Sequence, residues 1–248
     1  MLAQSNKRPF VKNAILAGIS LPDLAALRPF LEPFVLRQRT ILQEPRKPVE
    51  YVYFIESGIV SLRIVAAESM LETAIVGYHG AVGASLVFEG HVQSYRAVVL
   101  FPGAALRIRL HDLRRVLNEC DQIREHLLRY VQALAIHGAQ SGFCGVRHNL
   151  EQRLASWLCL TCDALDGRVL PVTHDHLSNM LGLRRPGVTE TLIRFEEQGL
   201  IRKMRGILQV DDRMRLEQKA CSCYGIVAGT YISAGHQPRM EQRAEVSA

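Results

Sequence analysis

The spacing of apolar residues divides the chain into a β-rich first half and a helical second half. From about residue 35 to residue 109, short runs rich in β-branched and aromatic residues alternate with Gly, Pro and charged turns. These runs predict strands at 51–58, 59–67, 71–77, 94–101 and 104–110. Short strands at this density indicate a small sandwich or barrel. Ahead of them, residues 1–34 predict one or two short helices.

A long helix is predicted from His111, where the apolar spacing changes to steps of three and four residues. Its apolar stripe consists of Leu113, Val116, Leu117, Cys120, Ile123, Leu127, Leu128, Val131 and Leu134. A stripe of this length favours pairing with a second copy of the chain about a two-fold axis. The alternative is that the stripe packs on the chain's own barrel. Gly138, Gly142 and Gly145 then interrupt the pattern and predict a hinge.

Residues 173–199 predict two short helices joined by a glycine turn. Thr173 is suited to cap the first helix, 174–181, because its hydroxyl can accept a hydrogen bond from a first-turn amide. Gly182 can take a positive φ and end that helix. Pro186 fits the first turn of the second helix, where no amide hydrogen bond is lost. This layout is that of a helix-turn-helix.

The outward faces of this segment indicate contact with DNA. In a helix-turn-helix the second helix lies in the major groove, and its first residues meet the base edges. We expect Arg185 to fork onto a guanine and Gly187 to allow close approach of the backbone. A strand before the motif and a hairpin after it, with Arg205 and Gly206 at the tip, predict a winged form. The residues predicted to contact DNA are Thr173, Arg184, Arg185, Gly187, Thr189, Glu190, Arg194, Arg202, Lys203 and Arg205. The alternative is a structural helical hairpin whose outer face is only solvated.

Composition agrees with this interpretation but adds little to it. Hydrophobic residues make up 48% and charged residues 22% of the 248 residues, and the net charge is +6, which suits a polyanionic partner. No apolar run approaches the ~20 residues that span a bilayer, and no signal peptide is evident, so we expect a cytoplasmic protein. There the six cysteines are expected to be thiols. A serine elbow, a phosphate loop and a carboxylate pair beside a base are all missing from the sequence, so we expect no enzymatic activity.

Three stretches together resemble the Crp/Fnr family of bacterial transcription regulators. They are VYFIESGIVSLR (52–63), LSNMLGLRRPGVTETLIRFEEQGLI (177–201) and GILQVDDRMRLEQKACSCYG (206–225). The resemblance covers about residues 20–225. It implies an α+β fold with a jelly-roll-like, cyclic-nucleotide-binding-like β-roll at 20–110, a dimerisation helix at 111–140, a winged helix-turn-helix at 146–225 and a flexible tail at 226–248. It also implies a homodimer that binds a palindromic operator in duplex DNA and contacts RNA polymerase.

The chain departs from familiar relatives at positions that set specificity. Many relatives carry a Glu where Pro186 stands and an Arg where Glu190 stands, so we expect an operator of different sequence. Relatives that bind cyclic nucleotides carry a Gly-Glu-Leu stretch and an Arg-Ser pair, whereas this chain has Ala84 in place of the Glu. Losing that carboxylate removes a charge-assisted hydrogen bond of ~1.5–3 kcal/mol. We therefore expect no response to cyclic AMP. The candidate effector pocket consists of Gly83, Ala84, Ser94 and Arg96. A small-molecule sensor remains the alternative function.

The cysteines carry a third hypothesis. The first one is Cys120, so the N-terminal iron–sulfur cluster of the oxygen-sensing branch is not expected. Cys159 and Cys162 form C-x-x-C, and Cys221 and Cys223 form C-x-C, so these four could act as a thiol or metal sensor. The apolar neighbours of Cys159 favour simple core packing instead. We expect no metal and no cofactor.

Overall fold

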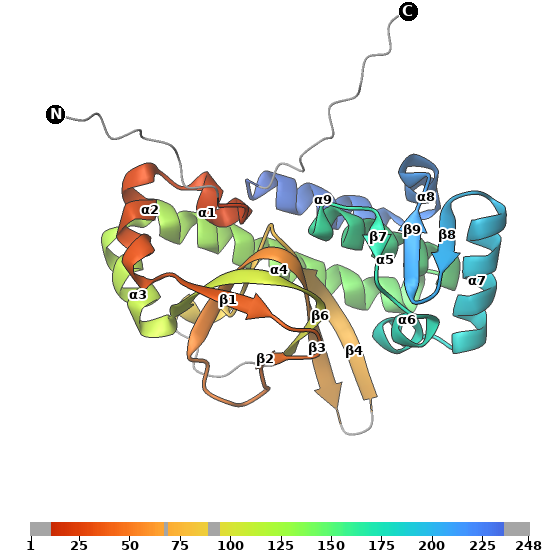
Figure 1. The fold of residues 1–248 in the computed structure, drawn as a ribbon, viewed down its shortest axis with the longest axis horizontal. Coiled ribbons are helices and arrows are strands. Elements are labelled where there is room, and N and C mark those ends of the chain that lie inside the picture. Colours follow the sequence, from red (N-terminus) through yellow and green to blue (C-terminus); the bar gives the residue numbers. More distant parts are fainter. Residues whose placement is uncertain (1–10, 67–68, 89–94, 236–248) are drawn as a thin grey trace, which may run out of the picture.

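The structure, a computed structural model, describes residues 11–66, 69–88 and 95–235. A β-roll and a winged helix-turn-helix lie side by side along one long helix (Figure 1). The N-terminal part has helices α1 Ala14–Gly18 and α2 Leu21–Leu27, the short 3-10 helices η1 Arg28–Phe30 and η2 Ala84–Phe88, and strands β1 Glu32–Leu36, β2 Ile41–Gln43, β3 Tyr51–Ala66, β4 Ser69–Val76, β5 Ala81–Val82 and β6 Arg96–Arg109. The rest has helices α3 Leu110–Glu119, α4 Asp121–Arg147, α5 Leu150–Leu165, α6 His174–Leu181, α7 Arg185–Glu197, α8 Arg213–Lys219 and α9 Ser222–Ser233, with strands β7 Val169–Leu170, β8 Ile201–Met204 and β9 Ile207–Val210.

The β-roll is one antiparallel sheet ordered β1-β6-β3-β4, with β2 on β6 and β5 on β3. Strands β3 and β6 are continuous, although the sequence predicted a break in each. The glycines at the predicted breaks are sites of close backbone approach: a Cβ at Gly103 would lie 2.2 Å from the Ser57 carbonyl oxygen, and a Cβ at Gly58 would lie 2.6 Å from that of Phe101. The pairing of β3 with β6 shifts register at this place. Glycine therefore bends the two strands here without ending them.

The interior of the roll is filled with apolar side chains, so it forms a packed core. Its buried residues are Leu36, Tyr53, Ile55, Val60, Leu62, Ala74, Val76, Val82, Ala97, Val99 and Ala105. The β3–β4 side of the roll also reaches the helix-turn-helix. Leu71 of β4 lies against Gly182 at the end of α6, and Ser61 contacts the sulfur of Met180 at 3.7 Å. The β-roll and the helix-turn-helix thus touch directly.

The long helix differs from its prediction in two ways. It is broken at Cys120, where the backbone turns extended, and α4 then runs without interruption to Arg147. The predicted hinge at Gly138, Gly142 and Gly145 is therefore wrong. Glycine lowers helix stability by ~1 kcal/mol relative to alanine, but it does not end a helix unless a cap follows. The chain leaves α4 only at the extended residue His148, and Asn149 then caps α5 in a capping box with Gln152.

The predicted dimer stripe is mostly covered by the chain itself. Ile123 and Leu127 of α4 are fully buried in a core shared with α1, α2 and β3. Leu113, Val116 and Leu117 of α3 belong to the same core. The alternative interpretation, packing on the chain's own N-terminal domain, therefore holds for these residues. Leu128 stands apart, because 46% of its surface is exposed.

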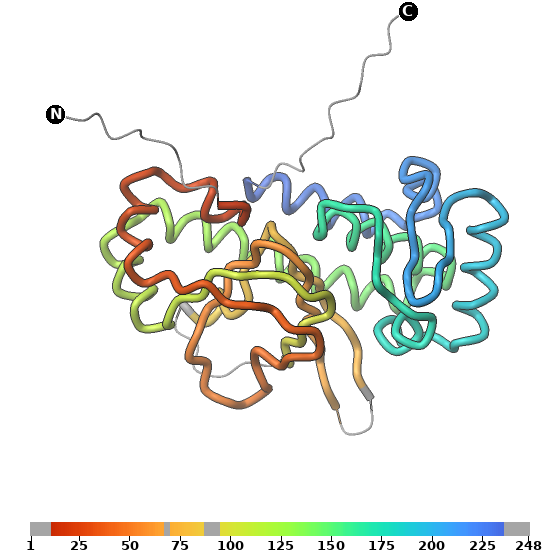
Figure 2. The backbone as a smooth tube through the Cα atoms, viewed as in Figure 1, coloured from red at the N-terminus to blue at the C-terminus, as the bar shows by residue number. Residues whose placement is uncertain are grey.

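The flexible tail predicted from residue 226 is wrong over its first part. Helix α9 continues to Ser233 and lies along α4 (Figure 2). Its buried face explains the order: Val227 and Tyr231 are buried, and the Tyr231 hydroxyl is 3.0 Å from Nδ1 of His137 in α4. The sequence does not predict this helix, because α9 contains two glycines and no strong helix former in its first turn. Residues 236–248 lie outside the described part.

Candidate nucleic-acid interface

Helix α6 begins and ends at the residues that the sequence predicts. The Thr173 hydroxyl accepts a hydrogen bond from the His176 amide at 3.2 Å and so caps the first turn. Gly182 adopts φ 59° and closes the helix with a hydrogen bond from its amide to the Ser178 carbonyl. This left-handed conformation is the one that glycine adopts without strain. The turn therefore directs the chain into α7 at a fixed angle.

Helix α7 packs through one apolar face and leaves the other outward. Val188, Leu192 and Phe195 are fully buried among residues of α5, β8 and α8. Pro186 occupies the first turn, as predicted. Most outward side chains are exposed, and three of them are cationic: Arg184, Arg185 and Arg194. The helix thus carries exposed arginines at its start, with Arg194 and the acidic Glu190 and Glu197 exposed further along it.

Two contacts tie the start of α7 to α6. The Arg185 guanidinium lies 2.9 Å from the Asp175 carboxylate. The Thr189 hydroxyl is 3.0 Å from Nδ1 of His174. Burial, with the charges of Lys203 and Arg185, lowers the pKa of His174. The imidazole is therefore neutral near pH 7. Because it carries no charge, it does not compete with Arg185 for the Asp175 carboxylate.

Gly187 has a packing role that the sequence did not reveal. A Cβ at this position would lie 2.8 Å from Cδ1 of Leu150, at the start of α5. A side chain here would therefore require the tip of Leu150 to move. The close approach to nucleic acid that we expected of Gly187 stays a prediction.

The wing is the hairpin of β8 and β9, with β7 as a third strand paired to β9. Its tip is at Arg205 and Gly206, as predicted, and Gly206 has φ 74°. Lys203 is held by Glu196 at 2.7 Å, and Arg202 lies 3.3 Å from Asp211. A hollow between the start of α6 and the wing is lined by residues that include Thr173, Arg185 and Lys203.

The candidate effector residues are only partly brought together. Ala84 is buried and Gly83 has φ 89°, with its Cα facing the side chain of Gln43. Arg96 is half-exposed and pairs with Glu44 at 3.0 Å. Ser94 lies outside the described residues. The conformation of Gly83 explains why a glycine stands there, independently of any ligand.

Cys159 and Cys162 lie apart from the C-x-C pair. Cys159 and Cys162 are buried in α5, where the Arg213 guanidinium donates to the Cys159 sulfur at 3.1 Å. Burial raises the pKa of both thiols, that of Cys162 to about 12. The alternative hypothesis of one site shared with the C-x-C pair is therefore wrong, and the core packing favoured for Cys159 is confirmed.

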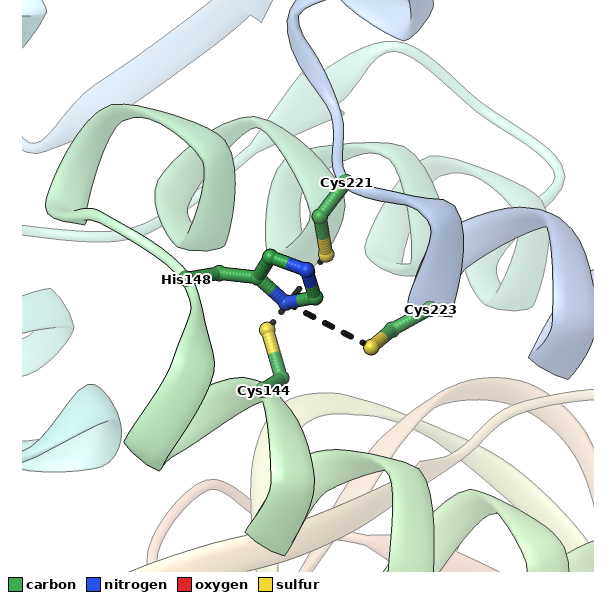
Figure 3. Close-up of side chains that lie close together, drawn as sticks. All are labelled: Cys144, His148, Cys221 and Cys223. Atoms are coloured by element: carbon green, nitrogen blue, oxygen red, sulfur yellow. Dashed lines mark hydrogen bonds between the residues drawn. The ribbon is translucent and has the colours of Figure 1, made fainter.

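Cys221 and Cys223 lie instead beside Cys144 and His148 (Figure 3). The first two come from the start of α9, and the other two come from the end of α4 and the residue after it. Sequence reasoning missed this cluster. The available signal was the Cys144-x-x-x-His148 spacing, which places both residues on one face at the end of a helix.

Comparisons with known proteins agree with this geometry. Residues 152–219 match the model of the Crp-like helix-turn-helix domain. The fold is similar to that of FixK2 from Bradyrhizobium japonicum, at 18% identity and a TM-score of 0.66, over 77% of this chain and 98% of that one. It is also similar to the c-di-GMP responsive global regulator CLP of Xanthomonas campestris, at 14% identity and a TM-score of 0.63, over 77% and 99%. A CRP-family transcriptional regulator from Thermus thermophilus has 16% identity and a TM-score of 0.59, over 76% and 96%.

A search of curated proteins found no match to the chain. Within the described residues, each helix is too short or too polar to cross a membrane.

Proposed function

We propose that this chain, which carries a Crp-like helix-turn-helix domain on the fold of the Crp/Fnr regulators, is a sequence-specific regulator of transcription. One observation carries the proposal: a winged helix-turn-helix whose second helix begins with two exposed arginines, Arg184 and Arg185. A structural hairpin would need only the buried face of α7. The exposed arginines lie outside that buried face, although Arg185 pairs with Asp175 and Arg194 lies 3.8 Å from Glu151. Their charge is opposite to that of a DNA backbone.

Base recognition falls to the first two turns of α7. A recognition helix presents its N-terminal residues to the major groove. Arg185 is exposed, and Asp175 holds its guanidinium in place, so it is ready to fork onto a guanine. Glu190 can accept a hydrogen bond from a cytosine amino group. The methyl group of Thr189 can contact a thymine methyl while its hydroxyl is occupied by His174.

Backbone contacts surround this reading surface. The first-turn amides of α6 and the side chains of Arg184 and Arg194 suit phosphates, since both cations and helix N-termini attract anions. On the wing, Arg205 stands at the exposed tip. Lys203 and Arg202 form ion pairs with acidic neighbours. They therefore contribute to DNA binding through long-range attraction more than through direct contacts with phosphates. We therefore assign positioning to the wing and sequence reading to α7.

A second copy of the chain is required for a palindromic operator. The face of α4 that remains outward carries exposed residues at heptad-like steps, namely Leu128, Ala135, Ala139, Phe143 and Val146. Val146 is 83% exposed and Phe143 52% exposed. We propose that this face, which shares Leu128 with the predicted stripe but none of its buried residues, forms the dimer seam. Small residues at its centre let two helices approach closely.

A second candidate function concerns the β-roll. The side chain of Gln43 is buried beside Gly83, and neither of its polar atoms has a hydrogen-bond partner among the described residues. Such an amide costs about 1–3 kcal/mol, which a polar ligand could offset. We therefore propose a small-molecule effector at Gln43, Gly83 and Arg96. Calorimetry with cyclic AMP, cyclic GMP and c-di-GMP tests it, and we expect cyclic AMP not to bind, because Ala84 supplies no carboxylate.

The output of such a regulator is contact with RNA polymerase, or its exclusion from the promoter, after the operator is bound. The test of operator recognition is selection of bound sequences from a random duplex library by the full chain. We expect enrichment of an inverted repeat with half-sites about one helical turn apart, ~10 base pairs. Recovery of sequences without a shared motif would contradict the proposal.

A further inference from the structure

We propose that Cys144, His148, Cys221 and Cys223 form a zinc site that fastens α9 to the junction of α4 and α5. The site does not depend on the DNA-binding function proposed above. It joins residues that are far apart in the chain, since Cys144 and Cys221 are 77 positions apart. Its ligands point toward one another from two segments of the backbone (Figure 3).

The four ligand atoms lie close to the spacing of a tetrahedral site. The sulfurs of Cys144 and Cys221 are 3.4 Å apart, and Nδ1 of His148 is 3.6 Å from the sulfur of Cys223. All four atoms lie within 4.8 Å of one another. Zinc bonds of ~2.3 Å to sulfur and ~2.0 Å to nitrogen place tetrahedral ligand atoms about 3.5–3.8 Å apart. Small side-chain rotations would bring all four atoms onto one ion.

The chemistry of the set selects the metal. Three thiols and one imidazole are the Cys₃His combination of structural zinc sites. The cluster contains no carboxylate, so it does not suit magnesium or calcium, which take oxygen ligands. The set also supplies four protein ligands and leaves no position open for a reacting water. We therefore infer a structural or regulatory ion and not a catalytic one.

The surrounding backbone fixes the ligands in place. Cys144 and His148 are four residues apart at the end of α4, so their side chains share a face. Cys221 is the residue before α9, and its amide donates to the Ser156 hydroxyl at 3.0 Å. The same hydroxyl is 3.1 Å from the Cys221 sulfur. Ser156 of α5 thus orients a ligand in the way that outer-shell groups orient metal ligands.

The position of the site gives it a consequence for the whole chain. His148 is the extended residue between α4 and α5, where the DNA-binding part joins the long helix. Helix α9 returns from that part along α4. An ion bound here would set the angle between the two parts. Cys144 and Cys223 also line a hollow that reaches Glu72 of β4, which offers a route to the site.

Metal analysis of the full chain tests the proposal. The chain, purified without chelator and without a histidine tag, should contain about one zinc ion per chain. Cys223→Ser and His148→Ala should lose most of this zinc to a chelator that leaves the unmodified chain loaded. Cys120→Ser is the matched control, because Cys120 is a partly buried cysteine outside the cluster, and it should keep its zinc.

Cobalt gives a readout that needs no variant. Addition of Co²⁺ to the chelator-treated full chain should produce the thiolate charge-transfer and tetrahedral visible bands, and zinc should abolish both. A chain that takes up neither metal would overturn the proposal. So would zinc retained by both cluster variants, or a disulfide between Cys144 and Cys221 in the purified protein, which needs the sulfurs to close to ~2.05 Å.

Discussion

Glu72 is a buried carboxyl group where the β-roll meets α5. It accepts hydrogen bonds from Ser61 and from Nε1 of Trp157. Burial raises its pKa to about 6, although both hydrogen bonds and the Arg63 charge oppose that shift. The carboxyl therefore remains protonated in the folded chain at pH values where it ionises in the unfolded chain. The contribution of Glu72 to the free energy of unfolding therefore falls as pH rises from about 4.5 to about 6.

This sign gives a prediction for Glu72→Gln. The glutamine in this variant does not titrate. The free energy of unfolding of the variant, minus that of the unmodified chain, should therefore increase by up to about 2 kcal/mol as pH rises from about 4.5 to about 6. Urea unfolding at several pH values measures the difference. The two chains must be compared because His137 also titrates. Burial lowers the pKa of His137 to about 4, so its contribution to the free energy of unfolding rises with pH, and it does so equally in both chains. A difference that stays constant between pH 4.5 and pH 6.5 would contradict a raised pKa at Glu72.

Arg185 is predicted to read bases. Arg185→Ala should reduce the preference for the operator over other duplexes by about 1–3 kcal/mol. Arg205→Ala at the wing tip is the control, and it should weaken all duplexes alike and lower the salt slope by about 1. Arg205 serves better than Lys203 here, because Lys203 also holds Glu196. Fluorescence anisotropy on both duplexes supplies the numbers. Equal weakening of all sequences by Arg185→Ala would remove its base-reading role.

The residues that cap and end α6 could be predicted from the sequence, whereas the cluster of cysteines and histidine could not. Thr173 and Gly182 have roles that depend on their own few neighbours, a cap and a left-handed turn, so the sequence predicts them. The cluster around Cys144 and Cys221 depends on α9 folding back along α4. No local spacing encodes that contact, and the sequence therefore paired Cys221 with the wrong cysteines.

At the scale of elements, α9 shows how packing overrides weak propensity. Two glycines weaken it as an isolated helix. Its order depends on Val227 and Tyr231, which face α4 and the β-roll. The Tyr231 ring lies 4.5 Å from that of His79, centre to centre. A buried aromatic of this kind dominates the packing of a short helix.

Tyr231→Ala should therefore lower the free energy of unfolding by about 3–5 kcal/mol, the range for buried aromatic truncations. Ile232→Ala is the matched control on the same helix, because Ile232 is exposed, and its effect should stay within about 0.5 kcal/mol. Denaturant unfolding followed by circular dichroism measures both. Similar values for the two variants would mean that α9 does not pack as described.

Strands β3 and β6 also depend on contacts between distant segments. Gly58 and Gly103 sit where sequence rules place turns, yet both lie inside continuous strands. Their role depends on backbone from the other strand, at 2.6 Å and 2.2 Å from an added Cβ. The alternation of residues predicts the strand character of most of β3, β4 and β6, but it predicts neither β1, β2 and β5 nor the order of the strands in the sheet. It does not predict the bend either, because the bend arises from a contact between distant segments.

At the scale of the whole molecule, the two faces of the long helix differ in burial. One face of α4 packs within the chain, and the opposite face stays exposed at Leu128, Phe143 and Val146. The predicted stripe mixed the two faces, because Leu127 and Leu128 are neighbours in sequence but differ in burial. Periodicity alone cannot show which face a neighbouring domain covers.

Val146→Glu should convert the proposed dimer to monomer, because two facing carboxylates would be desolvated and repel each other. It should also weaken operator binding, since a single half-site provides only half of the contacts. Ile226→Glu, at an exposed site on α9, should leave the dimer intact. Light scattering coupled to size-exclusion chromatography gives the mass. A Val146→Glu chain that remains dimeric would place the seam elsewhere.

DNA recognition by α7 is tested most directly by one titration. The full chain is titrated with the duplex most enriched from the random library and with a shuffled duplex of equal length and composition, at ~150 mM salt, where nonspecific charge attraction is weakened. We predict tighter binding of the enriched duplex by at least ~10³-fold, the lower end for specific sites. Equal affinity for the two duplexes would contradict sequence-specific binding and leave only the attraction of a basic surface for a polyanion.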